Sequence, residues 1–324
     1  MRASTDPTSP VTGTASASSM GAPAASAAIL AELDAGRRRA AVPDPGSPGG
    51  WRADSDVKAA ILACFRERTL ATWDLGGALK FADRVGLPVK DLLDGPEADA
   101  AARAGRPWRV VPGGTSIRAG VYLGPGVVVM PPSFINVGAR IGEDTMVDSH
   151  VLVGSCAQIG ARVHLSAGVT IGGVLEPAGA RPVIVEDGAF VGAGCSLLEG
   201  VLVGANAVIG AGTVLTGTSR VYDLVRGRVL IGTPDAPLAV PPGAVVVPGT
   251  RAVAGDFAAQ HGLAMSVALL VKDPFFQGNV DFRLHDRFLS FSGNAKRANR
   301  TDITTPAPSS RLPDTPPRPF RGRA

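Results

Sequence analysis

The stretch that decides the fold is residues 117–173, which read IRAGVYLGPGVVVMPPSFINVGARIGEDTMVDSHVLVGSCAQIGARVHLSAGVTIGG. Steps of six residues from Ile117 meet Ile, Leu or Val every time, and after an interruption the same steps resume at Val185. The seventeen positions are Ile117, Leu123, Val129, Ile135, Ile141, Val147, Val153, Ile159, Leu165, Ile171, Val185, Val191, Leu197, Val203, Ile209, Leu215 and Val221. A period of six fits neither a helix nor a simple pleated strand, so it indicates a short strand and a corner, repeated.

Three such hexads make a triangular coil of about 18 residues, and successive coils stack as parallel strands about 4.8 Å apart. The sequence therefore predicts a mainly β protein, a prism of between five and six coils and roughly 27 Å in length, with the aliphatic side chains inside. The fourth hexad position is often Gly, Asn or Asp, which tolerate a positive φ at a corner. The spacing alone does not give the handedness of the coil.

Eight extra residues, 177–184, interrupt the hexads. We expect them to form a loop expelled from the prism, the kind of insertion at which binding functions concentrate. We expect a capped helix at residues 57–66 after Asp54, and further short helix and turn at residues 73–94. The chain is predicted to divide into a disordered N-terminus (1–24), a helical domain (25–108), the prism (109–252), a C-terminal segment (253–292) and a disordered, basic, Pro-rich tail (293–324).

Composition restricts the function classes. The net charge of the 324 residues is +4, and the tail after residue 292 carries seven Lys or Arg against two Asp. The rest of the chain is close to neutral, so we expect no specific nucleic-acid partner. Three cysteines without metal-ligand spacing predict reduced thiols, a cytoplasmic protein and no metal site. No apolar run approaches the length of a membrane-spanning helix, so no membrane association is expected.

More specific motifs lie within the hexads. They are WRVVP at 108–112, MVDSHVLVGSCAQIG at 146–160, VHLS at 163–166 and IGGVLEP at 171–177. With these motifs the chain, over about residues 25–272, resembles the tetrahydrodipicolinate N-succinyltransferase family of hexapeptide-repeat acyltransferases. The resemblance implies a left-handed parallel β-helix with an N-terminal α-helical domain, assembled as a homotrimer with active sites between neighbouring prisms.

The resemblance also implies a reaction. A succinyl group would pass from succinyl-CoA to the amine of 2-amino-6-oxopimelate, the ring-opened form of tetrahydrodipicolinate, in the biosynthesis of diaminopimelate and lysine. Succinyl-CoA would be a co-substrate, and no cofactor would be bound permanently. Two alternatives stay open: a paralogue of secondary metabolism that uses another acyl donor or amine, and a catalytically inactive structural trimer.

Two residues match the substrate-binding positions of that family. Asp148 matches the Asp that binds the substrate amine and assists the base, since an ammonium must lose a proton before it attacks a thioester. Arg109 matches an Arg suited to a dicarboxylate, because guanidinium pairs bidentately with carboxylate. The structural alternatives are a corner-capping Asp and a surface Arg.

One position departs from the family pattern. Ser196 stands where the family has a second catalytic carboxylate, a Glu, and serine cannot act as a carboxylate base. Glu199 lies three residues further on and is our candidate for that role, although it falls at a different point of the hexad. His150, two residues after Asp148, is an alternative base. We expect His164 to be a corner or subunit-contact residue and Cys156 to pack at the edge of the core.

Four further residues are candidates for contact with CoA. Gly172, Gly173 and Glu176 border the inserted loop, where backbone amides beside glycine can approach the pantetheine arm closely. Lys272, at the end of AMSVALLVK, is suited to the CoA phosphates. The structural alternatives are a turn around an insertion for the first three and a solvated lysine for the last.

Overall fold

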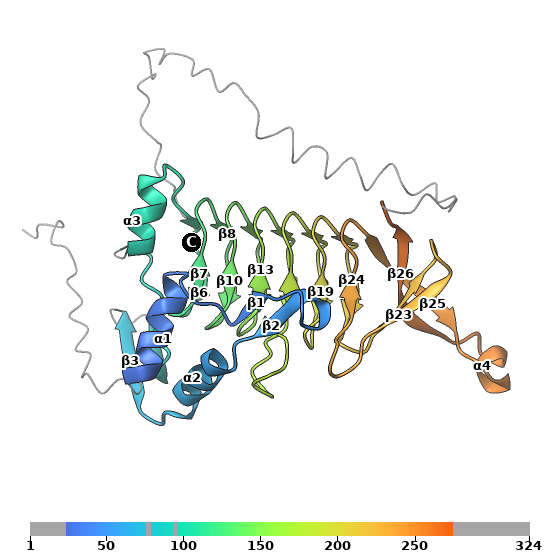
Figure 1. Cartoon of the computed structure of the whole chain (residues 1–324), viewed down its shortest axis with the longest axis horizontal. Helices are drawn as coiled ribbons and strands as arrows, with labels where there is room; N and C mark the ends of the chain where they lie inside the picture. The colour runs from blue at the N-terminus through green and yellow to red at the C-terminus, as the bar shows by residue number, and fades with distance from the viewer. Residues whose placement is uncertain (1–23, 76–78, 94–95, 275–324) are drawn as a thin grey trace, which may run out of the picture. The chain divides into compact units, whose positions relative to one another are not determined.

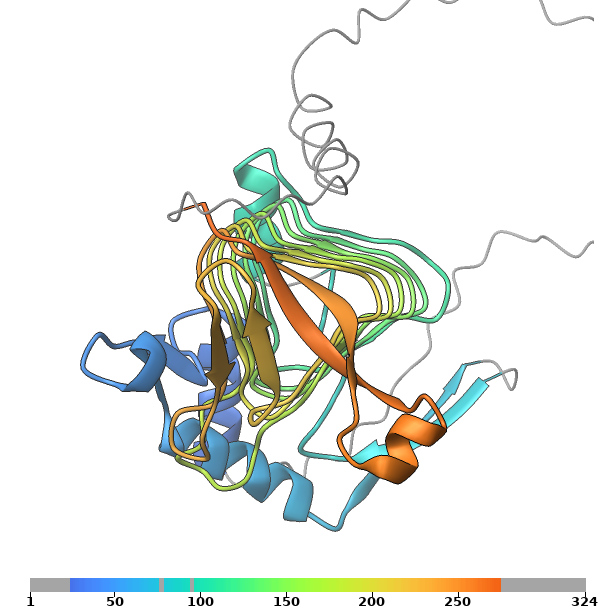
Figure 2. The same ribbon diagram turned by 90° about the vertical axis from the view of Figure 1, so that its right-hand side faces the viewer.

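The structure is a computed structural model, and it describes residues 24–75, 79–93 and 96–274. All of them belong to residues 1–280, the first of two compact units into which the chain divides. Its main feature is a stack of coils with short strands on three faces, visible side-on in Figure 1 and along the stack in Figure 2. This is the left-handed parallel β-helix that was expected.

Each of the first two faces of the prism is a parallel sheet of six two-residue strands. The first face consists of β6 (Ser116–Ile117), β9 (Phe134–Ile135), β12 (Leu152–Val153), β15 (Thr170–Ile171), β18 (Ser196–Leu197) and β21 (Val214–Leu215). The second face consists of β7 (Tyr122–Leu123), β10 (Arg140–Ile141), β13 (Gln158–Ile159), β16 (Ile184–Val185), β19 (Leu202–Val203) and β24 (Ala239–Val240).

The third face is longer because the chain enters and leaves the prism there. Its parallel part consists of β5 (Arg109–Val110), β8 (Val128–Val129), β11 (Met146–Val147), β14 (His164–Leu165), β17 (Phe190–Val191), β20 (Val208–Ile209) and β25 (Val245–Ala252). The chain visits the faces in the order first, second, third. We call the bends third-to-first, first-to-second and second-to-third corners.

The predicted aliphatic positions form the interior. Each hexad residue from Ile117 to Leu215 is the second residue of its strand and is buried. Neighbouring rungs are offset by 18 residues, so that Ile141 lies beside Ile159 and Val147 beside Leu165. The inward side chains therefore stack on their own kind along the prism, which confirms the hexad interpretation.

Two insertions leave the prism, and both do so at the first-to-second corner. Gln158 pairs with Ile184 across 26 residues rather than 18, so the eight-residue insertion falls where it was expected. The second insertion was missed, because Leu202 pairs with Ala239. The expected last hexad at Val221 instead belongs to β22 (Arg220–Asp223), which pairs antiparallel with β23 (Arg228–Ile231).

The physical reason for this departure lies in Asp223. Its Oδ1 accepts the backbone N–H groups of Val225 and Arg226 at 3.1 and 3.0 Å, which turns the chain back on itself. Val221 is buried all the same, against the last coil and β26 (Ala264–Lys272). The hexad pattern thus predicted the burial of Val221 correctly and its strand partner wrongly.

The N-terminal region packs on the outside of the prism. Helix α1 (Ala24–Asp34) contacts α2 (Ser55–Arg66) through Leu30, Leu33, Ile61 and Cys64. The carboxylate of Asp54 accepts the N–H groups of Asp56 and Val57, so it caps α2 as expected. Strand β1 (Ala41–Pro43), the single turn η1 (Pro48–Gly50) and β2 (Trp51–Ala53) lie against the second face, and α3 (Pro96–Arg103) precedes the first coil.

The expectation of helix from residue 73 onward is wrong. Strands β3 (Leu70–Leu75) and β4 (Leu79–Arg84) form an antiparallel hairpin in which Trp73 lies opposite Phe81. Large aromatic residues opposite each other stabilise a strand pair more than an isolated short helix. The region expected to be a helical domain therefore contains two hairpins besides its three helices.

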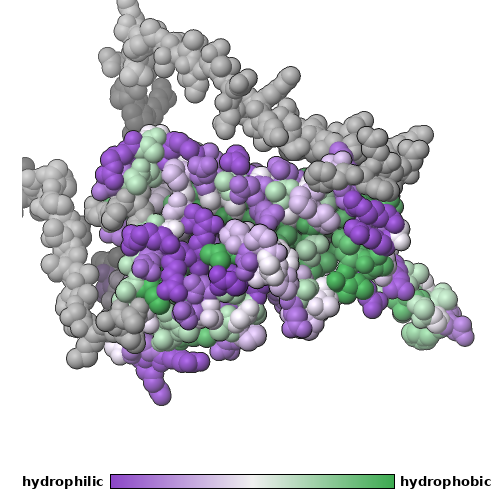
Figure 3. All heavy atoms as spheres, viewed as in Figure 1, coloured by the Kyte–Doolittle hydropathy of each residue, from purple (hydrophilic) through white to green (hydrophobic). Residues whose placement is uncertain are grey.

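The chain ends its described course in a long hairpin. Strand β25 pairs antiparallel with β26, and α4 (Asp256–Gln260) lies between them. Figure 3 shows apolar surface toward this end of the prism. Exposed apolar side chains of this region are Val229, Ile231, Val253, Phe257, Leu263 and Met265. No helix in the described ranges has the length and apolar character needed to cross a membrane.

The tight stacking of coils gives a first prediction. A Cβ on Gly142 would lie 2.4–2.5 Å from the backbone of Gly160 and Ala161 in the next coil, so Gly142→Ala forces two coils apart. We expect a loss of about 1–3 kcal/mol in the free energy of unfolding, as for other overpacked sites. Equilibrium denaturation in guanidinium chloride measures it.

The matched control is Gly179→Ala in the inserted loop, where an added Cβ meets no atom within 4 Å. The control should change the free energy of unfolding by less than about 1 kcal/mol. Equal stability of the two variants would contradict the close approach of the coils.

Candidate functional site

Asp148 lies at a third-to-first corner, directly after β11. Its backbone N–H donates to the carbonyl of Leu165 at 2.9 Å, and its own carbonyl accepts the hydroxyl of Ser133 at 2.9 Å. Its carboxylate Oδ1 accepts the N–H of Ser149 at 2.7 Å. The half-buried carboxylate is therefore held by the coil itself, with the corner-capping contact that the structural alternative required.

Arg109 lies on the same face, but it is in register with Val128 and Met146, at the opposite end of the strands from Asp148. Its rung is adjacent to that of Met130, and Met130 lies one rung from Asp148. The exposed guanidinium approaches Met130, with Nη2 3.8 Å from Sδ. Two rungs correspond to about 10 Å along the prism.

His164 is the next group along this face, on the rung that follows Asp148. The imidazole is half-buried, and its centroid is 5.2 Å from that of Phe190. Burial lowers the pKa of His164, and the Asp148 carboxylate raises it. The sequence pointed to His164 only as a corner or contact residue, whereas the structure makes it the electrostatic neighbour of Asp148.

His150 lies at the tip of the corner that begins with Asp148. Its side chain is exposed, its φ is 61°, and its backbone N–H donates to Pro132 at 2.7 Å. The left-handed backbone turns the chain from the third face to the first, so the side chains of His150 and Asp148 extend from different positions of the corner. Its role as an alternative base stays a prediction.

Ser196 and Glu199 keep the positions that a regular hexad gives them. Ser196 is in β18 on the first face, between Thr170 and Val214. Glu199 lies at the next first-to-second corner with a φ of 54°, and its Oε2 accepts the N–H of Gly217 at 3.2 Å. The coil is regular at this point, so Glu199 does not take the place that Ser196 occupies in the hexad. Within one chain, Glu199 and Asp148 therefore lie at different corners.

The residues around the inserted loop do come together. A cavity of about 680 Å³ lies between the two insertions, and its lining includes Gly173, Glu176 and Glu199. Gly172 is next to this lining in sequence, directly before Gly173. A Cβ on Gly173 would lie 2.8 Å from the backbone nitrogen of Ser155, so the chain at this point approaches the neighbouring coil closely. The cavity is of a size that holds a small molecule or part of a larger one.

Arg181 organises this corner, and no motif in the sequence points to it. The guanidinium is buried and donates to the carbonyls of Gly200 at 3.1 and 2.9 Å, Pro237 at 2.9 Å and Pro48 at 3.3 Å. It joins both insertions to the N-terminal region. Only the folded structure shows these acceptors, because they come from three distant segments of the chain.

Lys58 is a second fastening that the sequence did not reveal. This lysine of α2 is fully buried, and its Nζ donates to the carbonyl of Ala180 in the inserted loop. Burial lowers the pKa of Lys58. Cys156 lies nearby, fully buried, and burial raises its pKa to about 12, which fits a packing residue rather than a nucleophile.

Lys272 ends β26 opposite Val245, on the third face. It is half-buried and lies apart from the cavity at the first-to-second corner. Within one chain the candidate residues thus form two groups. Arg109, Asp148, His164 and Lys272 belong to the third face, and Gly172, Gly173, Glu176 and Glu199 belong to the first-to-second corner. The described residues contain no group of three His, Cys, Asp or Glu arranged to hold a metal ion.

Residues 138–173 match the family model described as bacterial transferase hexapeptide (six repeats), and residues 182–217 match that described as hexapeptide repeat of succinyl-transferase. Three relatives bear the name 2,3,4,5-tetrahydropyridine-2,6-dicarboxylate N-succinyltransferase.

The first relative, from Dechloromonas aromatica, is 41% identical over 222 residues, which cover 68% of this chain and 75% of the relative. The second, from Idiomarina loihiensis, is 43% identical over 224 residues, covering 68% and 74%. The third, from a Methylobacterium species, is 40% identical over 247 residues, covering 76% and 82%.

The Asp148–His164 pair gives a prediction about pH. In Asp148→Asn the carboxylate that raises the pKa of His164 is gone while burial remains, so the pKa of His164 should fall further. Because folding lowers the pKa of His164, the folded state binds fewer protons than the unfolded state. The contribution of His164 to the free energy of unfolding is therefore lost as the pH falls below about 6.5. Titration of the imidazole protons by NMR measures the shift.

The control is Asp144→Asn, which removes an exposed carboxylate with a φ of 54° from a second-to-third corner. Asparagine tolerates that conformation, so the change removes the charge and its exposed ion pair with Arg106 and leaves the backbone as it is. The titration of His164 should stay as in the parent protein. A shift of equal size in both variants would contradict a specific Asp148–His164 interaction.

Proposed function

The chain belongs to the 2,3,4,5-tetrahydropyridine-2,6-dicarboxylate N-succinyltransferase family, and from this we propose that it transfers a succinyl group from succinyl-CoA to the amine of 2-amino-6-oxopimelate. The observation that carries the proposal is the proximity of Arg109 and Asp148 on the third face, where the Arg109 guanidinium reaches Met130, the residue one rung from Asp148. It offers a guanidinium for a carboxylate of the acceptor and a carboxylate for its amine.

In the proposed reaction the amine first loses a proton, and Asp148 orients the ammonium and accepts that proton. The free amine then attacks the thioester carbonyl of succinyl-CoA. A C–N bond forms, the C–S bond breaks, and the leaving CoA thiolate takes up the proton that the new amide nitrogen loses. Arg109 fixes the acceptor by pairing with one of its carboxylates. This chemistry needs no covalent acyl-enzyme, which agrees with the inert, buried Cys156.

For the donor, we propose that CoA lies along the first-to-second corner. The cavity beside Gly173 and Glu176 supports this, because the close approach of the backbone there leaves N–H and carbonyl groups for an extended arm. Lys272 is proposed to meet the phosphates. Since Lys272 belongs to the third face, this arrangement needs the corner of one chain and the third face of another.

A homotrimer supplies that arrangement, and two features support it. The outward side chains of the third face include Val128, Met146, Phe190 and Val208, a half-exposed apolar row of the kind that associates with another surface. The second feature is the division of the candidate residues between two parts of one prism. A cyclic assembly brings the third face of each chain beside a different part of its neighbour.

Activity tests the proposal directly. With 2-amino-6-oxopimelate as acceptor, we expect thiol release from succinyl-CoA and much less from acetyl-CoA. Asp148→Asn should lower kcat about 100-fold or more, the range for loss of a general base. Asp144→Asn, the change at the second-to-third corner, should keep full activity.

Transfer from acetyl-CoA at the higher rate would overturn the assignment of the donor and favour the paralogue that Ser196 suggests. No thiol release with either donor would favour the inactive trimer. Retention of activity within a few-fold in Asp148→Asn would overturn the role of that residue.

The separation of Asp148 and Glu199 gives a second test, by mixing variants. Asp148→Asn and Glu199→Gln, each expected to be nearly inactive, are co-expressed with different tags, and trimers that carry both tags are isolated. Each mixed trimer has one neighbouring pair in which both carboxylates are intact, so about one third of the activity of the unsubstituted protein should return. Mixed trimers no more active than either single variant would show that the two carboxylates do not act in one site. Full activity in Glu199→Gln alone would exclude Glu199.

A further inference from the structure

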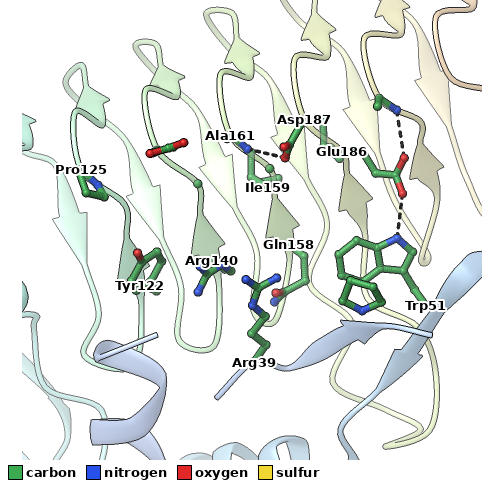
Figure 4. A pocket seen from close by; sticks show the side chains of 16 residues that line it. Arg39, Trp51, Tyr122, Pro125, Arg140, Gln158, Ile159, Ala161, Glu186 and Asp187 are labelled. Carbon is green, nitrogen blue, oxygen red and sulfur yellow. Dashed lines mark hydrogen bonds between the residues drawn. The ribbon is translucent and has the colours of Figure 1, made fainter. Parts of the chain in front are cut away.

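A second cavity lies between the N-terminal region and the second face of the prism, and the proposed acyl transfer does not use it. Its volume is about 620 Å³, within the range of small-molecule sites. Figure 4 shows the side chains that line it. The floor is a ladder of outward residues on three adjacent rungs, Tyr122, Arg140 and Gln158, and Arg39 and Trp51 come from the N-terminal region.

One end of this cavity carries two guanidinium groups. Arg140 stacks on Tyr122, with Cζ 3.9 Å from the ring centroid, and its buried Nη1 has no hydrogen-bond partner. Among the described residues, neither Arg140 nor Arg39 has a carboxylate within 4.0 Å. Burial lowers the pKa of Arg140, and the charge of Arg39 lowers it further. Two like charges thus face each other beside an unused donor.

The same end carries an unused acceptor. Gln158 is 3% exposed, and its Nε2 donates to backbone carbonyls, with the shortest bond to Cys156 at 2.9 Å. Its Oε1 has no hydrogen-bond partner. A buried polar atom without a partner is costly, so a donor that reaches Oε1 is favoured. An inorganic anion offers acceptors to the two arginines. A fully ionised anion has no donor for Oε1 of Gln158.

The other end of the cavity is acidic. Glu186 accepts the indole N–H of Trp51 at 3.0 Å and the N–H of Ala205 at 3.1 Å. Asp187 accepts the N–H of Ala161 at 2.8 Å, and Glu143 faces the same space. Asp187 and Glu143 also pair with Arg162, at 3.5 and 3.7 Å. Among the described residues, Glu186 is the carboxylate of this end that has no cationic partner within 4.0 Å. The rung of Glu186 lies two rungs from that of Arg140, which is about 10 Å along the prism.

We propose that this cavity binds a basic α-amino acid. The α-carboxylate lies between Arg39 and Arg140, the α-ammonium donates to Oε1 of Gln158, and the side-chain ammonium reaches the carboxylate of Glu186. Such a ligand separates like charges and supplies partners for both unused atoms. It also joins the N-terminal region to the prism, since Arg39 belongs to the first and Arg140 to the second.

This site is independent of the proposed acyl transfer. It lies on the second face and the second-to-third corner, whereas Arg109 and Asp148 lie on the third face and the proposed CoA cavity at the first-to-second corner. It is also complete within one chain. Binding therefore does not depend on the identity of the acyl donor or acceptor.

Isothermal titration calorimetry of the full chain at constant ionic strength tests the proposal with three probes: L-lysine, L-norleucine (L-lysine without its side-chain ammonium), and inorganic phosphate. We expect saturable binding of one L-lysine per chain and binding of L-norleucine at least about tenfold weaker, because it lacks the side-chain ammonium. Phosphate should bind more weakly than L-lysine. Arg39→Gln and Arg140→Gln should each weaken L-lysine about tenfold or more.

Two controls define the site. Arg37→Gln removes an exposed arginine two residues from Arg39 and should bind L-lysine as the parent does. Arg109→Gln should also bind it unchanged, which separates this cavity from the proposed acceptor site. Should Arg140→Gln fail to fold, Arg39→Gln carries the test alone, and thiol release by that variant without L-lysine should equal that of the parent.

Several outcomes would overturn the proposal. They are the absence of saturable L-lysine binding, equal affinity for L-norleucine, phosphate binding as tight as that of L-lysine, or unchanged binding in Arg39→Gln. Each of them leaves the acyl-transfer proposal intact, since that depends on Asp148 and Arg109 and on a different measurement.

Discussion

Everything in this molecule depends on the stacking of one coil on the next at the spacing of hydrogen-bonded strands. Each inward aliphatic residue rests on another 18 residues away, and each corner passes within contact distance of the corner above. At Gly142 and Gly173 that distance leaves no room for a side chain. The coil is consequently rigid, and any segment that does not fit the repeat has to leave it, as both insertions do.

The repeat also determines where chemistry can be placed. A side chain at one hexad position has its neighbours on the adjacent rungs. Arg109 and His164 therefore share one row along the third face, and Met130 and Asp148 share a second row beside it. Such a row is long and shallow. It suits a short linear acceptor with charges at both ends, and it holds each group by backbone hydrogen bonds rather than by a flexible loop.

The sequence predicted what the period controls and missed what distant segments create. The burial of Ile117 through Leu215 followed from the hexads, and the Asp54 cap followed from local chemistry. Val221 misled because its burial satisfies the hexad rule while Asp223 turns the chain. The β3–β4 hairpin depends on the cross-strand pair of Trp73 and Phe81, which propensity did not reveal. Arg181 donates to carbonyls that are distant in sequence, and Arg39 and Arg140 come together from distant segments of the chain.

The two proposed sites differ in what they require of the fold. Acyl transfer draws on the third face and on a first-to-second corner, which one straight prism keeps apart, so it depends on assembly. The cavity of Arg39 and Arg140 depends instead on the docking of the N-terminal region, which Lys58 and Arg181 also fasten to the inserted loop. The second site is therefore complete in a single chain, whereas the first needs two.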